Sequence, residues 1–417
     1  MGAKITMFNF YFDESSHDRA ITYKDGEGLN IYLPSNNDLF VGFFWGFKQE
    51  KELTYQHQYS TIERYLKTIY SLNENQEFKG SIIKQKNFKF GFNSLKHNTI
   101  RVYSHLFQFL DNEEIILHIH LYSKTEYLIK HYFKEVTFTV GIANENAFIY
   151  SVIKFLFNYR DEEFLAGLFS NSTVSSEDFV EKLKSMLKIV IRNIYDVKRK
   201  KQELLNLQEM LYILENARIK THPKEKYKWD YKPVFIGLSK LLEEIKIDIN
   251  TVNLKIDPEG TNRIVNAAKQ QGFNSVSDDE DSSVNELIRV ADLLSNMFYR
   301  LTLALYESLK EDPFVNANEH DYATKRILNE EWFDIKNEEI YQLYVSLNKI
   351  LKINNGNYWT IFSGIYSDYA LLVVSLIEYI SEQYESFKHF KTVTAKNHAE
   401  YFNTYAGLKL MDRFQDI

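Results

Sequence analysis

The chain has 417 residues, of which 44% are hydrophobic and 26% are charged, so it is long enough for two or three globular domains. It contains no cysteine, which excludes disulfide bonds, thiolate zinc sites, iron–sulfur clusters and cysteine nucleophiles. Its net charge of −7 argues against a protein that coats nucleic acid through bulk charge. No signal peptide is evident, and the most apolar helical run, 369–377, is too short to span a bilayer, so we expect a cytoplasmic protein without a membrane partner.

The stretch from Phe8 to Ser16 predicts a central strand that ends at a carboxylate. Strict alternation places Phe8, Phe10 and Phe12 on one face of the strand, and Asp13 follows directly. A carboxylate at the end of a buried strand must be paired, desolvated or bound to a cation, and the last case makes a site. A simple turn is the alternative, because Asp and Ser favour turns.

The rest of the amino-terminal part predicts two more strands and two helices. A polar loop or small hairpin at 17–38 precedes them, and they are expected at 39–47, 56–72, 95–110 and 115–122. His118 and His120 fall on one face of the last strand, where metal ligation and a half-buried sheet face both explain them.

Residues 146–232 are more strongly charged and have helical periodicity, which predicts a helical insertion. An apolar stripe runs on both sides of the basic segment 198–201, as one long helix or a helical hairpin. Beyond it lysines alternate with aromatic residues, a pattern that can follow a phosphate backbone and stack bases. A solvated connector is the alternative. The candidates for nucleic-acid contact are Lys224, Lys226, Lys228 and Trp229.

The later part of the chain predicts a helix at 238–245 and then a strand at 251–257, which ends in Asp257 as the first strand ends in Asp13. A long helix follows, with Asp292 beside its apolar stripe. Residues 313–417 predict a separate helical region whose aromatic side chains pack on the main domain or on a second subunit.

Four acidic residues could therefore act together, since Asp13 and Asp257 end strands, Asp292 lies on a late helix and Glu77 lies in a polar segment between. Acids at the ends of neighbouring strands, closed by an acid from a helix, can hold two divalent cations about 3.5–4 Å apart. Such a pair of cations binds a scissile phosphate and activates water. The acids must gather because each cation needs anionic oxygen ligands.

Short motifs at these positions carry a resemblance to a known family. Phe10-Tyr11-Phe12-Asp13-Glu14-Ser15 resembles the opening F-Y-x-D-E-S-G signature of the bacterial domain-of-unknown-function 3800 family. Glu77-Phe78-Lys79-Gly80-Ser81 is similar to its E-x-K-x-S segment, and Ile256-Asp257 to its late strand ending in Asp. The run 289–294, Arg-Val-Ala-Asp-Leu-Leu, resembles its Q-x-A-D-L-L helix. The match covers roughly residues 6–122 and 233–305.

The resemblance implies an α/β protein with a ribonuclease H-like mixed sheet core. The divisions expected are a core at 1–145 and 233–312, a helical insertion at 146–232 and a helical carboxy-terminal region at 313–417. It also implies a metal-dependent nuclease that uses Mg²⁺ or Mn²⁺, in a bacterial or phage-related setting such as an antiphage-defence or toxin effector. The resemblance implies that the metal ligands are Asp13, Glu77, Asp257 and Asp292. It also implies that Lys79 contacts phosphate or orients an acid, and that Glu14 supports the ligands.

Two positions depart from the family pattern. Ser16 stands where the family usually has glycine, and Arg289 stands where it has glutamine. Neither change removes a candidate ligand, but Arg289 places a cation near the expected site.

Two other functions compete with a metal-dependent nuclease. The first is a non-catalytic binding or sensor protein that keeps the fold and acts through its helical regions, by self-association or by binding a partner. The second places the chemistry in the helices, as in helical ribonucleases with an Arg and a His a few residues apart. Arg218 and His222 are the nearest such pair, and Pro223 directly after them disfavours a helix.

Overall fold

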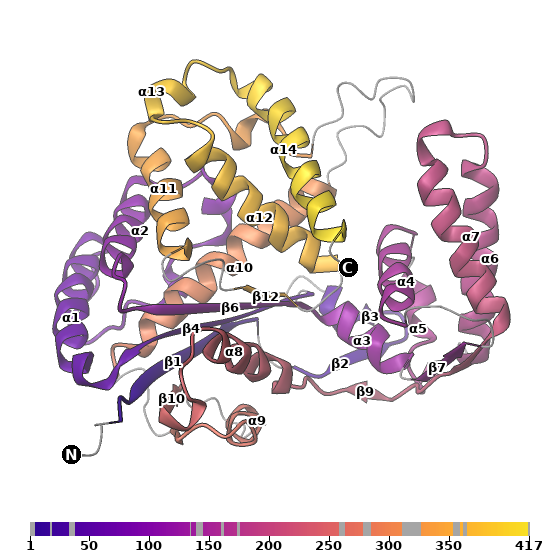
Figure 1. The fold of residues 1–417 in the computed structure, drawn as a ribbon, viewed down its shortest axis with the longest axis horizontal. Helices are drawn as coiled ribbons and strands as arrows, with labels where there is room; N and C mark the ends of the chain where they lie inside the picture. The colour runs from indigo at the N-terminus through magenta and orange to yellow at the C-terminus, as the bar shows by residue number, and fades with distance from the viewer. Residues whose placement is uncertain are drawn as a thin grey trace.

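The computed structural model describes residues 5–16, 19–32, 38–133, 135–138, 145–159, 162–172, 176–257, 263–277, 285–310, 327–352, 359–361 and 365–415. A mixed β-sheet lies at the centre of the molecule, with helices on both of its faces (Figure 1). The α/β class expected from the sequence is confirmed.

The central sheet has six strands, in the spatial order β11-β10-β1-β4-β6-β12. If the strands are numbered one to six in the order in which they occur in the chain, the first five are arranged 3-2-1-4-5 across the sheet. The second is antiparallel to both of its neighbours, whereas the fourth and fifth continue parallel to the first. The strands are β1 (Phe8–Ser15), β4 (Leu39–Lys48), β6 (Ile116–Ser123), β10 (Val252–Ile256), β11 (Ser275–Ser277) and β12 (Trp359–Ile361).

Both faces of β1 are buried, which explains its large aromatic residues. Phe12 faces a helix on one side of the sheet, with its ring centroid 5.5 Å from that of Phe235. Tyr11 points to the other side and stacks on Trp45 at 5.5 Å. Asp13 lies two residues after Tyr11, and because side chains alternate between the faces of a strand, it belongs to the same face as Tyr11.

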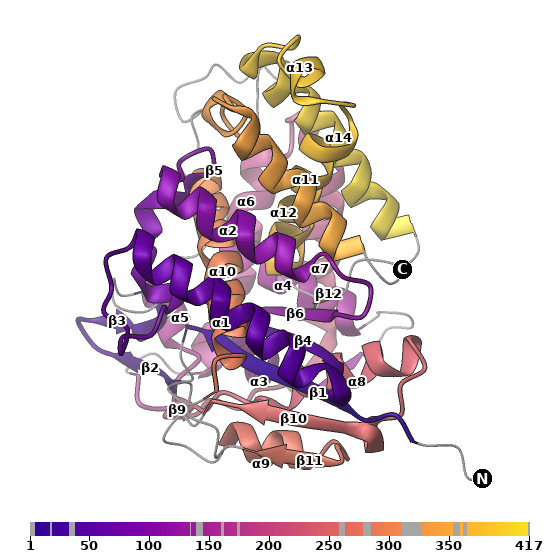
Figure 2. The ribbon, with the colours of Figure 1, turned by 90° about the vertical axis from the view of Figure 1, so that its left-hand side faces the viewer.

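Helices cover both faces of the sheet (Figures 1 and 2). The face that carries Tyr11 is covered by α1 (Glu52–Ile69), α2 (His97–Leu110) and α10 (Ile288–Lys310). The opposite face is covered by α8 (Lys232–Glu244) and α9 (Arg263–Lys269). A short strand, β5 (Lys89–Phe92), precedes α2.

The insertion combines helices with short strands. Helix α3 (Lys124–Tyr132) precedes it, and its own helices are α4 (Glu145–Tyr159), α5 (Glu162–Ala166), α6 (Ser176–Ile194) and α7 (Lys201–Asn216). The last two form a hairpin, one of the two expected arrangements (Figure 1). β7 (Glu135–Phe138) pairs with β8 (Ala217–Lys220), and β9 (Lys226–Tyr227) pairs with β2 (Ile21–Lys24), which forms a small hairpin with β3 (Gly28–Leu29).

The carboxy-terminal region packs on the main body, which is one of the two outcomes expected for its aromatic residues. It contains α11 (Glu338–Lys352), α12 (Ile365–Glu382), α13 (Phe387–Phe390) and α14 (Ala395–Gln415), which lie above α2 and α10 (Figure 1). It also adds β12 to the edge of the sheet beside β6, so it is joined to the core more closely than a separate region. Within the described residues, none of the helices is long and apolar enough to cross a membrane.

Candidate functional site

Three of the four predicted acids line one pocket of about 320 Å³: Asp13, Asp257 and Asp292. Asp13 lies near the carboxyl end of β1, and Asp257 follows β10 directly. Because these strands are parallel and Phe12 is opposite Ile256, the register brings Asp257 beside Asp13. Asp292 reaches the pocket from the second turn of α10. Residues far apart in the sequence therefore meet at one end of the sheet.

Asp292 is held by two hydrogen bonds that leave its carboxylate facing the pocket. The backbone N–H of Gly80 donates to Oδ2 at 2.6 Å, and Asn296 Nδ2 donates to Oδ1 at 2.7 Å. A Cβ at position 80 would lie 2.7 Å from the Asn296 side chain, so only glycine allows this approach to α10.

Burial and mutual repulsion dominate the electrostatics of the acidic pocket. Burial raises the pKa of Asp13 well above its ordinary value, and the Asp292 and Asp257 carboxylates raise it further, against the N–H of Glu14. Burial also raises the pKa of Asp292, opposed by the Gly80 N–H and by Lys79. Ionising these acids together is therefore unfavourable unless a cation joins them.

The chemistry of the donors suits a hard divalent cation. Carboxylate oxygens are the ligands that Mg²⁺ and Mn²⁺ prefer, and each oxygen has two lone pairs, so a hydrogen bond does not prevent ligation. In the part of the chain that the structure describes, however, no group of three or more His, Asp or Glu side chains is arranged so that it could hold a metal ion. The carboxylates of the acidic pocket would have to move closer together to share one.

Glu77 and Lys79 form an ion pair at the edge of this pocket. Lys79 Nζ lies 2.8 Å from Glu77 Oε2, and the hydrogen bond to Glu77 raises the pKa of Lys79, with further contributions from Asp257 and Asp292. Lys79 lines the pocket with 46% of its side chain exposed, whereas Glu77 is not among the lining residues. The structure thus brings together three of the expected ligands and the expected phosphate contact, with Glu77 next to Lys79.

Residues 14–16 connect the acidic pocket to the insertion. The buried Glu14 accepts a hydrogen bond from the Tyr231 hydroxyl at 2.7 Å. Ser16 has φ of +76°, in the left-handed region that favours glycine, so a serine at this position has a backbone cost. Lys124 Nζ donates a hydrogen bond to Ser16 Oγ at 2.9 Å, and a glycine at position 16 would have no side-chain oxygen to accept it.

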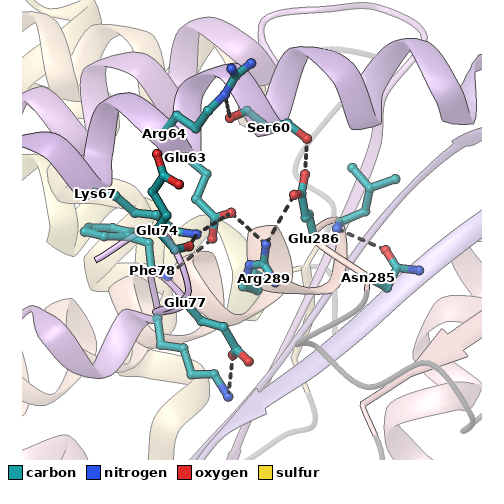
Figure 3. Close-up of polar contacts among 12 residues, drawn as sticks. Ser60, Glu63, Arg64, Lys67, Glu74, Glu77, Phe78, Asn285, Glu286 and Arg289 are labelled. Atoms are coloured by element: carbon teal, nitrogen blue, oxygen red, sulfur yellow. Dashed lines mark hydrogen bonds and ion pairs between the residues drawn. The ribbon is translucent and has the colours of Figure 1, made fainter. Parts of the chain in front are cut away.

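The sequence reading missed Glu63, which forms a buried ion pair with Arg289 across the helices next to the acidic pocket (Figure 3). Arg289 Nη2 lies 2.6 Å from Glu63 Oε2, and Arg289 also lines the pocket. The signal was present in the sequence: Glu63 falls between Tyr59 and Leu66 on the buried stripe of α1, a position where an acid needs a partner.

His118 and His120 belong to the core of the sheet rather than to a metal site. Both side chains are buried, with Phe44 5.6 Å from His118 and Phe40 6.3 Å from His120, measured between ring centroids. Burial, together with the neighbouring His118, lowers the pKa of His120 to about 3, so His120 is neutral.

The predicted nucleic-acid contacts divide into two groups. Lys224, Lys226 and Lys228 are exposed, but Trp229 is 5% exposed and packs 4.9 Å from both Phe40 and Tyr127. The expectation that Trp229 stacks bases is therefore wrong for this conformation, because packing on the sheet buries its ring.

Arg218 and His222 do not form the helical pair of the third hypothesis. Arg218 lies in strand β8, and the N–H of His222 donates to the carbonyl of Tyr132 at 3.0 Å.

Comparisons of the chain with protein-family models, with curated proteins and with solved structures found no match. The acidic pocket and the order of the strands are therefore the basis for a functional conclusion.

Proposed function

We propose that the chain is a metal-dependent nuclease with a ribonuclease H-like core, which hydrolyses phosphodiester bonds with Mg²⁺ or Mn²⁺. The observation that carries this proposal is the meeting of Asp13, Asp257 and Asp292 in one pocket at the end of the sheet. The strand order and directions support the ribonuclease H-like core, since in that fold too the first three strands are antiparallel neighbours and the fourth and fifth lie on the other side of the first strand, parallel to it.

The residues of the pocket have separate roles in this proposal. The three carboxylates hold the divalent cations, which would supply an activated water and neutralise the leaving oxygen. Lys79 contacts the phosphate from the exposed edge of the pocket, and Glu77 keeps its ammonium group in place. The repulsion that raises the pKa of Asp13 is what a bound cation relieves.

Cleavage of labelled RNA, single-stranded DNA and duplex DNA with Mn²⁺ tests the proposal. Wild type and Asp13→Asn are compared with Asp412→Asn, a matched control on the exposed surface of α14. We expect wild type and Asp412→Asn to cut one substrate class and Asp13→Asn to cut none. Equal cleavage by wild type and Asp13→Asn would contradict the proposal.

A non-catalytic binding protein is the second candidate, favoured by large exposed hydrophobic side chains on and next to the α6–α7 hairpin. Ile189, Tyr195, Leu205 and Tyr212 are between 49% and 65% exposed. Light scattering separates the candidates, because a monomer with nuclease turnover favours the enzyme, whereas an oligomer without turnover on any substrate favours the binding protein.

A further inference from the structure

The loop that follows α1 in the chain (residues 73–80), which we call the strap, is hydrogen-bonded both to α1 and to α10 beside the acidic pocket. The N–H of Phe78 donates to Glu63 Oε1 at 3.2 Å, which fastens the strap to α1. The N–H of Gly80 donates to Asp292 Oδ2 at 2.6 Å, which fastens it to α10. Because Asp292 is one of the three pocket acids, the position of the strap and the position of this carboxylate are linked.

The carboxylate of Glu63 is shared between the strap and Arg289 (Figure 3). Its other oxygen pairs with Arg289 Nη2 at 2.6 Å, and the two side chains are 3% and 4% exposed. Lys67 lies further away, 3.6 Å from the Glu63 carboxylate, and its ammonium group also donates to the carbonyl of Glu74 in the strap at 3.1 Å.

The pairing matters for the charge of the acidic pocket. Arg289 is a buried cation that lines this pocket beside Asp292. An arginine stays charged at any ordinary pH, so without Glu63 its guanidinium would be drawn to the pocket carboxylates and would occupy the place of a metal cation. With Glu63 in place, the charge of Arg289 is compensated and the pocket keeps its affinity for a cation.

We propose that Glu63 is a positioning residue of the metal site. It sets the strap through the N–H of Phe78, and it compensates Arg289 so that the acidic pocket can bind a divalent cation. This inference rests on the proposed function and adds to it a residue outside the pocket, Glu63, that controls the affinity of the pocket for the metal ion.

Calorimetric titration with Mn²⁺ tests the charge part. Glu63→Gln keeps an oxygen acceptor for Phe78 but leaves Arg289 without its charged partner, and we expect Mn²⁺ affinity to fall by about 10–100-fold, the usual loss for a residue that orients metal ligands. Glu63→Gln/Arg289→Gln removes both charges and should restore the affinity. Glu286→Gln is the comparison variant, because it removes an acid that lies 3.8 Å from Arg289 instead of 2.6 Å, and we expect a smaller loss of affinity than in Glu63→Gln. Unchanged affinity in Glu63→Gln, or no recovery in the double variant, would overturn the charge part.

Hydrogen exchange without metal tests the strap part independently of nuclease activity. Glu63→Leu/Arg289→Leu replaces the buried ion pair by apolar side chains, a change that proteins commonly tolerate, and it removes the acceptor for Phe78. We expect the amide of Gly80 to exchange at least about tenfold faster than in wild type, as it does in a locally opened segment. Exchange at the wild-type rate would overturn this part. If wild type binds no Mn²⁺, the proposed function fails, while the exchange result still decides the role of Glu63.

Discussion

Two pockets of similar volume, about 320 Å³ each, lie in different parts of the molecule and are built in different ways. The acidic pocket joins β1, β10 and α10, and it brings Asp13 next to Asp257 and Asp292, which lie more than two hundred positions later in the chain. The second, which we call the helical pocket, lies between α4 and α7 and is lined mainly by aromatic and aliphatic side chains, among them Phe155, Leu207 and Met210.

The difference teaches how to weigh a pocket as a functional site. Two amphipathic helices leave a hollow wherever their side chains do not interdigitate, which accounts for the space of the helical pocket. Its lining also includes Lys154, whose pKa is lowered by burial to about 8, but no second charge of the same sign lines it among the described residues. Packing does not account for three clustered carboxylates, because the burial of Asp13 and the repulsion from Asp292 and Asp257, which together raise its pKa, cost stability. A cost of this kind is typical of a functional site.

The largest effect should come from removing an acid of the acidic pocket. Asp257→Asn is expected to lower the cleavage rate by more than about 100-fold, because even the residues that orient metal ligands contribute about 10–100-fold. Lys154→Met in the helical pocket should leave the rate unchanged. Steady-state cleavage assays on both variants decide this, and a similar loss in the two would remove the distinction between the pockets.

Trp229 should matter for stability rather than for binding. Trp229→Ala removes a buried ring between Phe40 and Tyr127 and should lower the free energy of unfolding by about 3–5 kcal/mol. Urea denaturation measures it. A loss below about 1 kcal/mol would show that the ring is not part of the core in solution.

Gly80 should be the most sensitive position in the strap. Gly80→Ala forces the strap away from Asn296 and breaks the bond to Asp292, so we expect a loss of about 1–3 kcal/mol in stability. The control is Gly407→Ala in α14, where no described atom beyond the adjacent residues and the backbone of the helix itself lies within 4 Å of the new methyl group, and alanine should stabilise the helix by about 1 kcal/mol. Thermal denaturation of the two variants gives opposite signs if the close approach exists.

The neighbourhood of the helical pocket should show a pH dependence of stability. Burial raises the pKa of Glu126 from 4.5 to about 8, opposed by Lys130. The folded state therefore keeps a proton that the unfolded state loses, and the free energy of unfolding falls as the pH rises from 4.5 to 8. Glu126→Gln should flatten this slope and gain roughly 4 kcal/mol at pH 8. Urea denaturation at several pH values measures the dependence of the unfolding free energy on pH. If Glu126→Gln leaves this dependence unchanged, the Glu126 carboxylate is exposed to solvent and its pKa is not raised by burial.

The smallest effect should come from the exposed lysines of the insertion. Lys226→Gln/Lys228→Gln should weaken binding of nucleic acid only modestly and reduce its salt dependence by about one to two ions, since each phosphate contact contributes roughly one. Fluorescence anisotropy without divalent ions gives both values. An unchanged salt dependence would exclude these lysines from the interface.

Residue patterns indicated the main strands of the sheet and three of the acids that line the acidic pocket. Alternation located β1, and the two strands that end in aspartate indicated a common edge, because parallel strands carry equivalent ends to the same side. The edge strand β12 was missed since three residues give too little pattern to recognise. Glu77 was grouped with the other acids, but its place depends on the path of the strap, which no local pattern specifies.

Trp229 and Glu63 show what pattern alone could not decide. Lysines alternating with aromatic residues describe a strand with one solvated face as well as a nucleic-acid surface, and only the packing against β4 distinguishes the two. Glu63 lay on an apolar stripe, yet its partner Arg289 is more than two hundred residues away. Long-range pairing of this kind follows from the fold and not from spacing.

Direct binding of Mn²⁺ by the metal-free protein is the measurement that tests the central claim most directly. Calorimetric titrations of wild type, Asp13→Asn and Asp292→Asn should show saturable binding in wild type and its loss in both variants. Saturation at about 100 times the dissociation constant should also stabilise wild type alone by about 2.7 kcal/mol. Equal binding by all three proteins, or none by wild type, would contradict the assignment of the acidic pocket as a metal site.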